Sequence, residues 1–104
     1  MLRDTALRSV DDMNNYLVEQ YLPGVTARQL EEASAQLAAA ATELTKDGIE
    51  VRYINSTFIP DEESCFCRFE SVDAESVRRA CEQAGVPYAR IVETHTFFPN
   101  EEDQ

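Results

Sequence analysis

The chain has no tryptophan, one histidine, three glycines and four prolines among its 104 residues. It contains no glycine-rich phosphate loop, no nucleophile elbow and no His-x-x-x-His motif. The usual signatures of nucleotide-binding loops, serine hydrolases and helical zinc enzymes are therefore missing. The three cysteines are an odd number and follow no disulfide-framework spacing, so we expect a reducing compartment.

Long hydrophobic runs and basic residues are also scarce. No stretch of about 18 apolar residues is present, which argues against a membrane-spanning helix. The first eight residues lack the apolar run of a signal peptide. Acidic residues outnumber basic ones by 20 to 9, for a formal net charge of -11. This charge argues against nucleic acid and anionic membranes as partners and is compatible with cation binding. Together with the cysteines, these absences predict a cytoplasmic protein.

What is present is a regular order of periodic segments. Alternating apolar and polar residues predict strands over 13–22, 49–59, 64–70 and 91–98, and helical spacing predicts helices over 26–47 and 74–84. The order strand, helix, strand, strand, helix, strand is typical of a ferredoxin-like βαββαβ domain. We therefore predict an α+β fold in which a four-stranded antiparallel sheet carries two helices on one face.

Local signals mark where the helices begin. Thr26 and Gln29 form a capping box before the first helix, and Asp73 is the expected N-cap of the second. The predicted domain covers residues 13–98, between a flexible lead-in over 1–12 and an acidic tail over 99–104.

Right-handed crossovers predict the strand order 4-1-3-2. Both helices should then cover the face that carries Val18, Val51, Cys67 and Phe69. The opposite, open face is predicted to carry Leu17, Glu19, Tyr21, Arg52, Ile54, Phe66 and Arg68, together with Glu93 and His95 of the last strand. Because that face mixes large apolar side chains with both signs of charge, we expect a second copy to cover it, as in dimeric α/β-barrels.

Four segments of the chain resemble a known family. They are Tyr16-Leu-Val-Glu-Gln-Tyr-Leu-Pro-Gly24, Val51-Arg-Tyr-Ile-Asn-Ser-Thr-Phe58, Cys65-Phe-Cys-Arg-Phe-Glu70 and Gly85-Val-Pro-Tyr-Ala-Arg-Ile-Val92. In these segments the chain resembles small bacterial domains of unknown function grouped around a nickel-binding, nickel-responsive protein. The resemblance implies a ferredoxin-like fold and dimerisation through the sheet, and it admits a divalent metal such as nickel.

The cysteines allow two interpretations. Cys65 and Cys67 share one strand face, and Cys81 lies on the helix predicted to pack over it. Three converging thiols would suit a soft metal. Structural zinc sites, however, normally use four ligands with wider spacing, and free cysteine acts as a small buried hydrophobe. Core packing is therefore favoured, with metal or redox chemistry as the alternative.

The open face supplies the candidate binding residues. Glu19, Tyr21, Arg52, Phe66 and Arg68 are predicted to contact a small ligand, although the charged members alternatively form plain ion pairs. The candidate metal ligands are His95, Glu93 and Glu19, and His95 or Glu19 is the candidate general base. The alternative for His95 is a partly exposed histidine near the chain end, hydrogen-bonded to a neighbour.

Three functions remain open on the sequence. The first is a homodimer that binds a small ligand or a metal ion, with nickel as the implied metal. The second is a cofactor-free enzyme of the isomerase, cyclase or monooxygenase type, using acid/base groups on the open face. The third is a structural or regulatory dimerisation domain. A deep, largely apolar pocket around Glu19 and His95 would favour the enzyme, whereas a dry, flat contact between sheets would favour the third function.

Overall fold

The computed structural model describes residues 13–99. The lead-in predicted over 1–12 and the tail beyond residue 99 lie outside the described residues. Along the chain the elements are β1 (Asn14–Tyr21), α1 (Ala27–Lys46), β2 (Val51–Ile59), β3 (Ser64–Ser71), α2 (Ala74–Ala84) and β4 (Arg90–Thr94). The predicted βαββαβ order is confirmed. Neither of the two described helices is long and apolar enough to cross a membrane.

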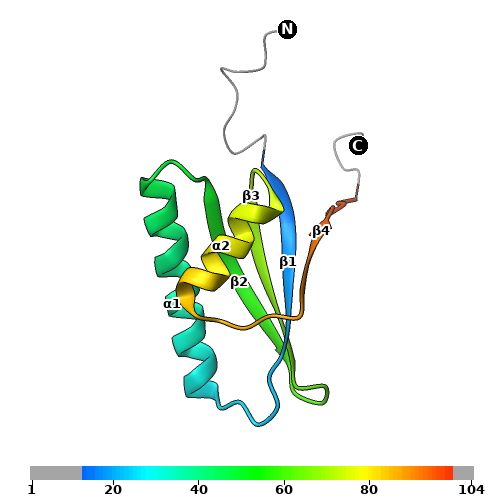
Figure 1. Cartoon of the computed structure of the whole chain (residues 1–104). Coiled ribbons are helices and arrows are strands. Elements are labelled where there is room, and N and C mark those ends of the chain that lie inside the picture. Colours follow the sequence, from blue (N-terminus) through cyan, green and yellow to red (C-terminus); the bar gives the residue numbers. More distant parts are fainter. Residues whose placement is uncertain (1–12, 100–104) are drawn as a thin grey trace, which may run out of the picture.

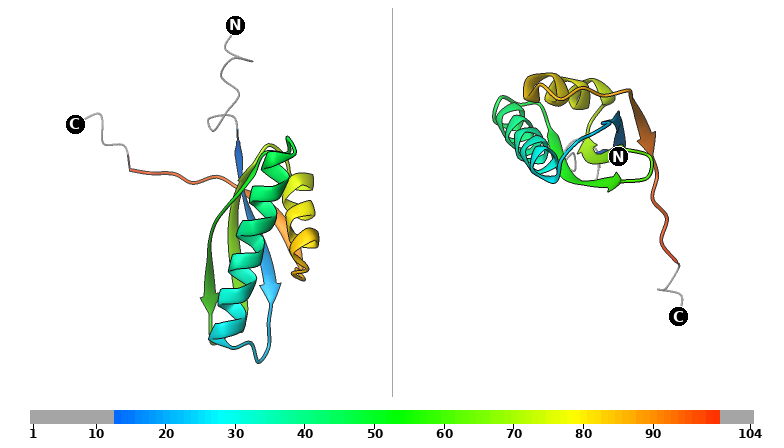
Figure 2. Two further views of the ribbon diagram at one scale, coloured as in Figure 1. Left: turned by 90° about the vertical axis from the view of Figure 1, so that its left-hand side faces the viewer. Right: turned by 90° about the horizontal axis from the view of Figure 1, so that it is seen from below.

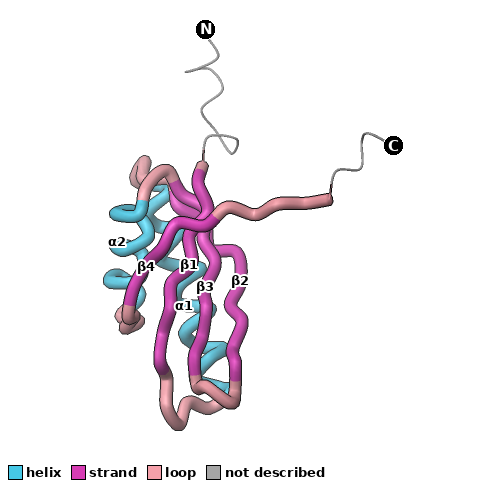
Figure 3. The backbone as a smooth tube through the Cα atoms, turned by 90° about the vertical axis from the view of Figure 1, so that its right-hand side faces the viewer, coloured by secondary structure: helices cyan, strands magenta, loops and turns pink. Residues whose placement is uncertain are grey.

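The four strands form one antiparallel sheet in the predicted order, β2-β3-β1-β4. Figure 1 shows α1 and α2 lying across one face of this sheet, and the views of Figure 2 separate the two layers. Figure 3 looks at the opposite face, where the strands lie in front and both helices lie behind them. The fold is therefore ferredoxin-like, with helices on one side of the sheet.

The core lies between the sheet and the two helices. Val18 of β1, Phe69 of β3, Leu37 of α1 and Val77 of α2 are each at most 1% exposed. They occupy the core-facing positions of a two-residue period in the strands and of the helical repeat in α1 and α2. Full burial of one such side chain contributes about 1.5–3 kcal/mol. This burial decides which face of the sheet the helices cover.

The caps of both helices form as predicted. In α1 the Gln29 backbone N–H donates to Thr26 Oγ1 at 3.1 Å, while the Thr26 N–H donates to Gln29 Oε1 at 2.9 Å. In α2 the Ser76 hydroxyl and backbone N–H donate to Asp73 at 2.7 and 2.9 Å. The hydroxyl bond is the main cause of a lowered pKa of Asp73.

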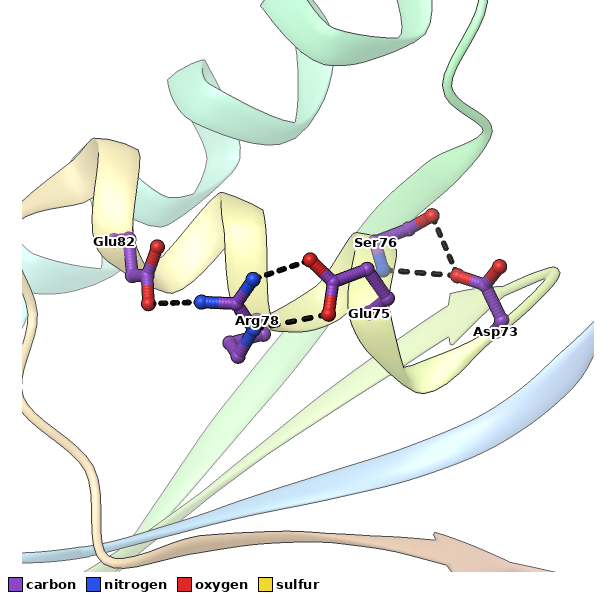
Figure 4. A network of polar contacts seen from close by, with 5 residues as sticks. All are labelled: Asp73, Glu75, Ser76, Arg78 and Glu82. Atoms are coloured by element: carbon purple, nitrogen blue, oxygen red, sulfur yellow. Dashed lines mark hydrogen bonds and ion pairs between the residues drawn. The ribbon is translucent and has the colours of Figure 1, made fainter.

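Arg78 adds ion pairs along the exposed side of α2. Its guanidinium contacts the carboxylates of Glu75 and Glu82, one on each side (Figure 4). Exposed pairs of this kind contribute little to stability because water and salt screen them. The Asp73 cap is therefore the more valuable polar contact of this helix.

β4 is shorter than the strand predicted over 91–98. It ends at Thr94, which pairs with Asn15. Because β1 begins at Asn14, only one residue of β1 lies beyond this pair. Residues 95–99 leave the sheet (Figure 3), and Phe97 and Phe98 are 87% and 81% exposed.

The pairing between β2 and β3 shifts by one residue at Ile54. Tyr53 and Asn55 pair with successive residues of β3, so Ile54 is left without a partner and forms a β-bulge. The bulge takes Ile54 out of the alternation that predicted its place on the open face, and Ile54 lines a groove beside α1 together with Tyr53. After the bulge the alternation changes phase, which brings Ser56 to the helix-covered face.

Candidate functional site

The open face consists of the strand side chains that point away from α1 and α2. The strand registers place there Arg52, Asn55, Thr57 and Ile59 of β2, Phe66, Arg68 and Glu70 of β3, Asn15, Leu17, Glu19 and Tyr21 of β1, and Arg90, Val92 and Thr94 of β4. Leu17 lies opposite Arg68 on one side and Val92 on the other. Leu17 and Val92 therefore form an apolar pair in the middle of this face, and the charged Arg68 lies directly beside it.

All five predicted ligand contacts lie on this face. Glu19 and Phe66 are directly opposite each other, Arg68 is two residues further along β3, and Arg52 and Tyr21 lie toward the ends of their strands. Tyr21 is 64% exposed, while Phe66 is half-buried. The structure thus groups these residues on one surface, and their contact with a ligand stays a prediction.

Two of the arginines on the open face are neutralised by carboxylates. Arg90 donates to both oxygens of Glu19 at 2.9 Å, and Arg52 Nη1 donates to Glu70 Oε1 at 3.0 Å. The hydrogen bonds from Arg90 hold the pKa of Glu19 below its usual range. Arg68, in contrast, has no carboxylate partner within the described part of the chain. Among the described residues, its guanidinium is the cation that this face leaves available.

The predicted metal ligands are only partly brought together. His95 Nε2 lies 3.4 Å from Glu93 Oε2, and both side chains are exposed. Glu93, however, pairs with Tyr16, a core residue, so it lies on the helix-covered side of the sheet. Its predicted place on the open face is wrong because Val92, its neighbour, takes that position opposite Leu17. Glu19 therefore lies on the other side of the sheet from Glu93.

The described residues of one chain do not build a closed metal site. Within residues 13–99, no three His, Cys, Asp or Glu side chains converge in a way that would hold a metal ion. Cys65, Cys67 and Cys81 are free and buried in the core. Burial raises the pKa of Cys67 to about 12 and that of Cys81 to about 11. Since metals bind the thiolate, these cysteines fit the core-packing interpretation.

Two residues that organise the polar contacts, Arg90 and Gln20, are not among the predicted site residues. Arg90 lies just before the strand predicted over 91–98, yet it opens β4 and pairs with Glu19. Gln20 is 4% exposed, donates to the Pro87 carbonyl at 2.9 Å and accepts from the Cys67 thiol at 3.2 Å. Its signal in the sequence is a polar residue at a core-facing position, two residues after Val18.

Comparison with known proteins shows the family to which the chain belongs. The family model described as "Nickel responsive protein SCO4226-like" matches residues 16–94. The chain belongs to this SCO4226-like family. The match runs from β1 to the last residue of β4, so it includes every described strand and helix and ends just before His95.

Among solved structures, this SCO4226-like protein is similar to the crystal structure of SCO4226 from Streptomyces coelicolor A3(2). The TM-score is 0.70 and the sequence identity is 22%, over 81% of this chain and 99% of that chain. At this identity the likeness shows the ferredoxin-like fold. No curated protein matches the chain.

Proposed function

We propose that this SCO4226-like protein is a homodimer that binds a small ligand between the open faces of two sheets. The observation that supports it is Arg68, which has no carboxylate partner among residues 13–99, beside half-buried Leu17, Phe66 and Val92 on a sheet face that neither described helix covers. A second copy would remove these apolar groups from water. The three free cysteines suit the reducing cytoplasm that we propose as its location.

The surroundings of Arg68 indicate the chemistry of the ligand. Its planar guanidinium donates in a fork that matches a carboxylate. Leu17 lies directly opposite Arg68, and Phe66 is the next residue of β3 on the same face. These neighbours would contact an apolar body while Arg68 holds the acid. We therefore expect a small molecule that joins a carboxylate to an aromatic or aliphatic group.

Binding is favoured over acid/base catalysis on this face. A general base works best when its pKa lies near the working pH. The pKa of Glu19 is moved further from neutral pH, because Arg90 lowers it. His95 is exposed, on the segment that leaves the sheet after β4. The arrangement therefore supports a ligand held by Arg68 rather than a proton transferred by Glu19.

A second candidate function is nickel binding shared by two copies. The family description names nickel, and imidazole and carboxylate are groups that Ni²⁺ accepts. His95 and Glu93 supply one of each, 3.4 Å apart. Two copies would double this pair. In this candidate the described residues that would hold the metal are His95 and Glu93, and the remaining ligands come from the second copy.

Ligand binding at Arg68 is tested by an NMR titration with 3-phenylpropanoate, a carboxylate with an apolar body. We expect saturable shifts at the amides of Leu17, Phe66 and Arg68. Arg68→Gln should weaken binding about tenfold or more, whereas Arg79→Gln, on the exposed side of α2, should change it less than about twofold. Shifts elsewhere, or equal binding by Arg68→Gln, would contradict the proposed site.

The nickel candidate is tested by metal analysis of the tag-free protein after incubation with NiCl₂ and gel filtration. Shared binding predicts nickel that co-elutes with the protein and is lost in His95→Ala. Thr96→Ala is the control, because it alters the neighbouring exposed residue without removing a metal ligand. Parent protein without nickel, or His95→Ala with the parental amount, contradicts this candidate.

A further inference from the structure

A groove of about 590 Å³ lies on the helix-covered side of the sheet, between α1 and the bulged part of β2. Cys65 and Cys67 of β3 line it from the sheet, and Ala33, Ala35 and Ala38 line it from α1. The small alanine side chains leave space that longer residues would fill. The volume is within the range of small-molecule sites, about 300–1,000 Å³.

A chain of hydrogen bonds runs along this groove into the core. Tyr53 Oη lies 2.6 Å from Ser34 Oγ on α1 and 2.6 Å from Ser56 Oγ on its own strand. The Ser56 hydroxyl donates to Cys67 Sγ at 3.1 Å, and the Cys67 thiol donates to Gln20 Oε1 at 3.2 Å. All five residues line the groove.

The direction of this chain follows from the number of protons. Each hydroxyl has one proton to donate. Since Ser56 gives its proton to Cys67, Tyr53 must donate to Ser56, and Ser34 must donate to Tyr53. The three hydroxyl protons are therefore used inside the chain. The Ser34 oxygen can therefore only accept a further hydrogen bond from a group in the groove, through its lone pairs.

The charge of the groove, like the free lone pairs of Ser34, favours a ligand that donates hydrogen bonds. Glu31 is the one charged side chain among the described residues that line it, and a carboxylate accepts hydrogen bonds. The Cys67 thiol, whose pKa is raised to about 12 by burial, stays neutral and acts as part of an apolar floor. A positively charged donor is therefore complementary to the rim, and an apolar group to the floor.

We infer that this groove binds a small molecule with an apolar body and a protonated amino group. The amine meets Glu31 and the Ser34 oxygen, and the body lies over Cys65 and Cys67 beside Ile54. The site is separate from the one proposed around Arg68, because the two lie on opposite faces of the sheet. The two sites also differ in the sign of the charge that they accept.

An NMR titration with 2-phenylethylamine tests this inference, with uncharged 2-phenylethanol as its matched ligand. We expect saturable amide shifts over residues 30–38 and 53–58, and binding of the amine at least about fivefold tighter than that of the alcohol. Glu31→Gln should remove most of this difference. No saturable shift in the groove up to about 10 mM, or equal binding of amine and alcohol by the parent, would overturn the inference.

Two variants at neighbouring alanines test the location. Ala38→Leu adds bulk inside the groove and should weaken amine binding about tenfold or more, whereas Ala39→Leu, which does not line it, should stay within about twofold of the parent. Both alanines are exposed, so both variants should fold. Tyr53→Phe keeps the aromatic ring, whose centroid lies 5.5 Å from that of the Phe69 ring in an edge-on contact. It removes the hydroxyl group and so breaks the chain of hydrogen bonds. Unchanged amine binding by Ala38→Leu and Tyr53→Phe together would overturn the assignment.

Discussion

Arg90 holds the carboxylate of Glu19 through two hydrogen bonds of 2.9 Å, from Nε and Nη2. The two residues face each other on β4 and β1. This bidentate contact lowers the pKa of Glu19 and fixes its side chain at the edge of the open face. Glu19 is therefore a constant anion of this face, and Arg68 beside it is a cation without a carboxylate partner among residues 13–99.

Replacing Arg90 by Gln should raise the pKa of Glu19 toward its ordinary value of about 4.3. The physical reason is the loss of the two hydrogen bonds that favour the carboxylate. A ¹³C NMR titration of the Glu19 carboxyl carbon measures this change. Arg52→Gln, which breaks the pair with Glu70, is the matched control and should leave Glu19 unchanged. The same Glu19 pKa in Arg90→Gln and the parent would refute the contact.

Leu37→Ala should lower the free energy of unfolding by about 2–5 kcal/mol. Leu37 is 1% exposed and packs in the core under α1. Gln36→Ala, at the exposed neighbouring position, should change it by less than about 0.5 kcal/mol. Urea denaturation measures both. A Leu37→Ala loss as small as that of Gln36→Ala would mean that the register of α1 is wrong.

Asp73→Ala should lower stability at pH 7 by about 0.5–2 kcal/mol through loss of the N-cap of α2. The folded pKa of Asp73 is lowered, so the charged cap stabilises above the unfolded value of about 3.9 and this contribution is lost as pH falls through the folded pKa. Urea denaturation should show that the difference in free energy of unfolding between Asp73→Ala and the parent is smaller at strongly acidic pH than at neutral pH. Asp73→Asn, which keeps an uncharged acceptor, is the control and should show less pH dependence. If Asp73→Ala lowers the free energy of unfolding equally at both pH values, the charge of Asp73 does not stabilise the cap.

The three cysteines should resist Ellman's reagent in the folded protein at mildly alkaline pH. Burial blocks the thiols and raises their pKa, most of all for Cys67, to about 12. Addition of denaturant should make all three react. Glu43→Cys places a thiol on an exposed position of α1 and should react at once. Labelling of the native cysteines at the rate of that control would revive the metal or redox interpretation.

Much of the fold was predictable because its signals are local. The Thr26–Gln29 capping box and the Asp73 cap set the starts of the helices, and both are seen in the structure. Two-residue alternation in β1 and β3 placed Val18 and Phe69 in the core. The strand order followed from the handedness of the connections. The caps and the alternation each depend on a short stretch of chain, and the strand order depends on the connections between neighbouring elements.

The remaining features depend on partners that are distant in the sequence. Ile54 is bulged because the registers on either side of it differ by one residue, and nothing in the run of Ile-Asn-Ser-Thr favours one face. Glu93 was assigned to the wrong face because the phase of β4 is set by β1. Arg90 was missed as the partner of Glu19 because the two are 71 residues apart.

The central claim, that two copies pair through the open face, is tested most directly by sedimentation equilibrium over about 1–100 µM. The parent should sediment at twice its chain mass of 11.8 kDa. Leu17→Asp puts a charge at the centre of the open face and should give a monomer, whereas Ala39→Asp, on the exposed side of α1, should remain dimeric. A parent protein that is monomeric throughout this range, or a Leu17→Asp variant that stays dimeric, would contradict the account.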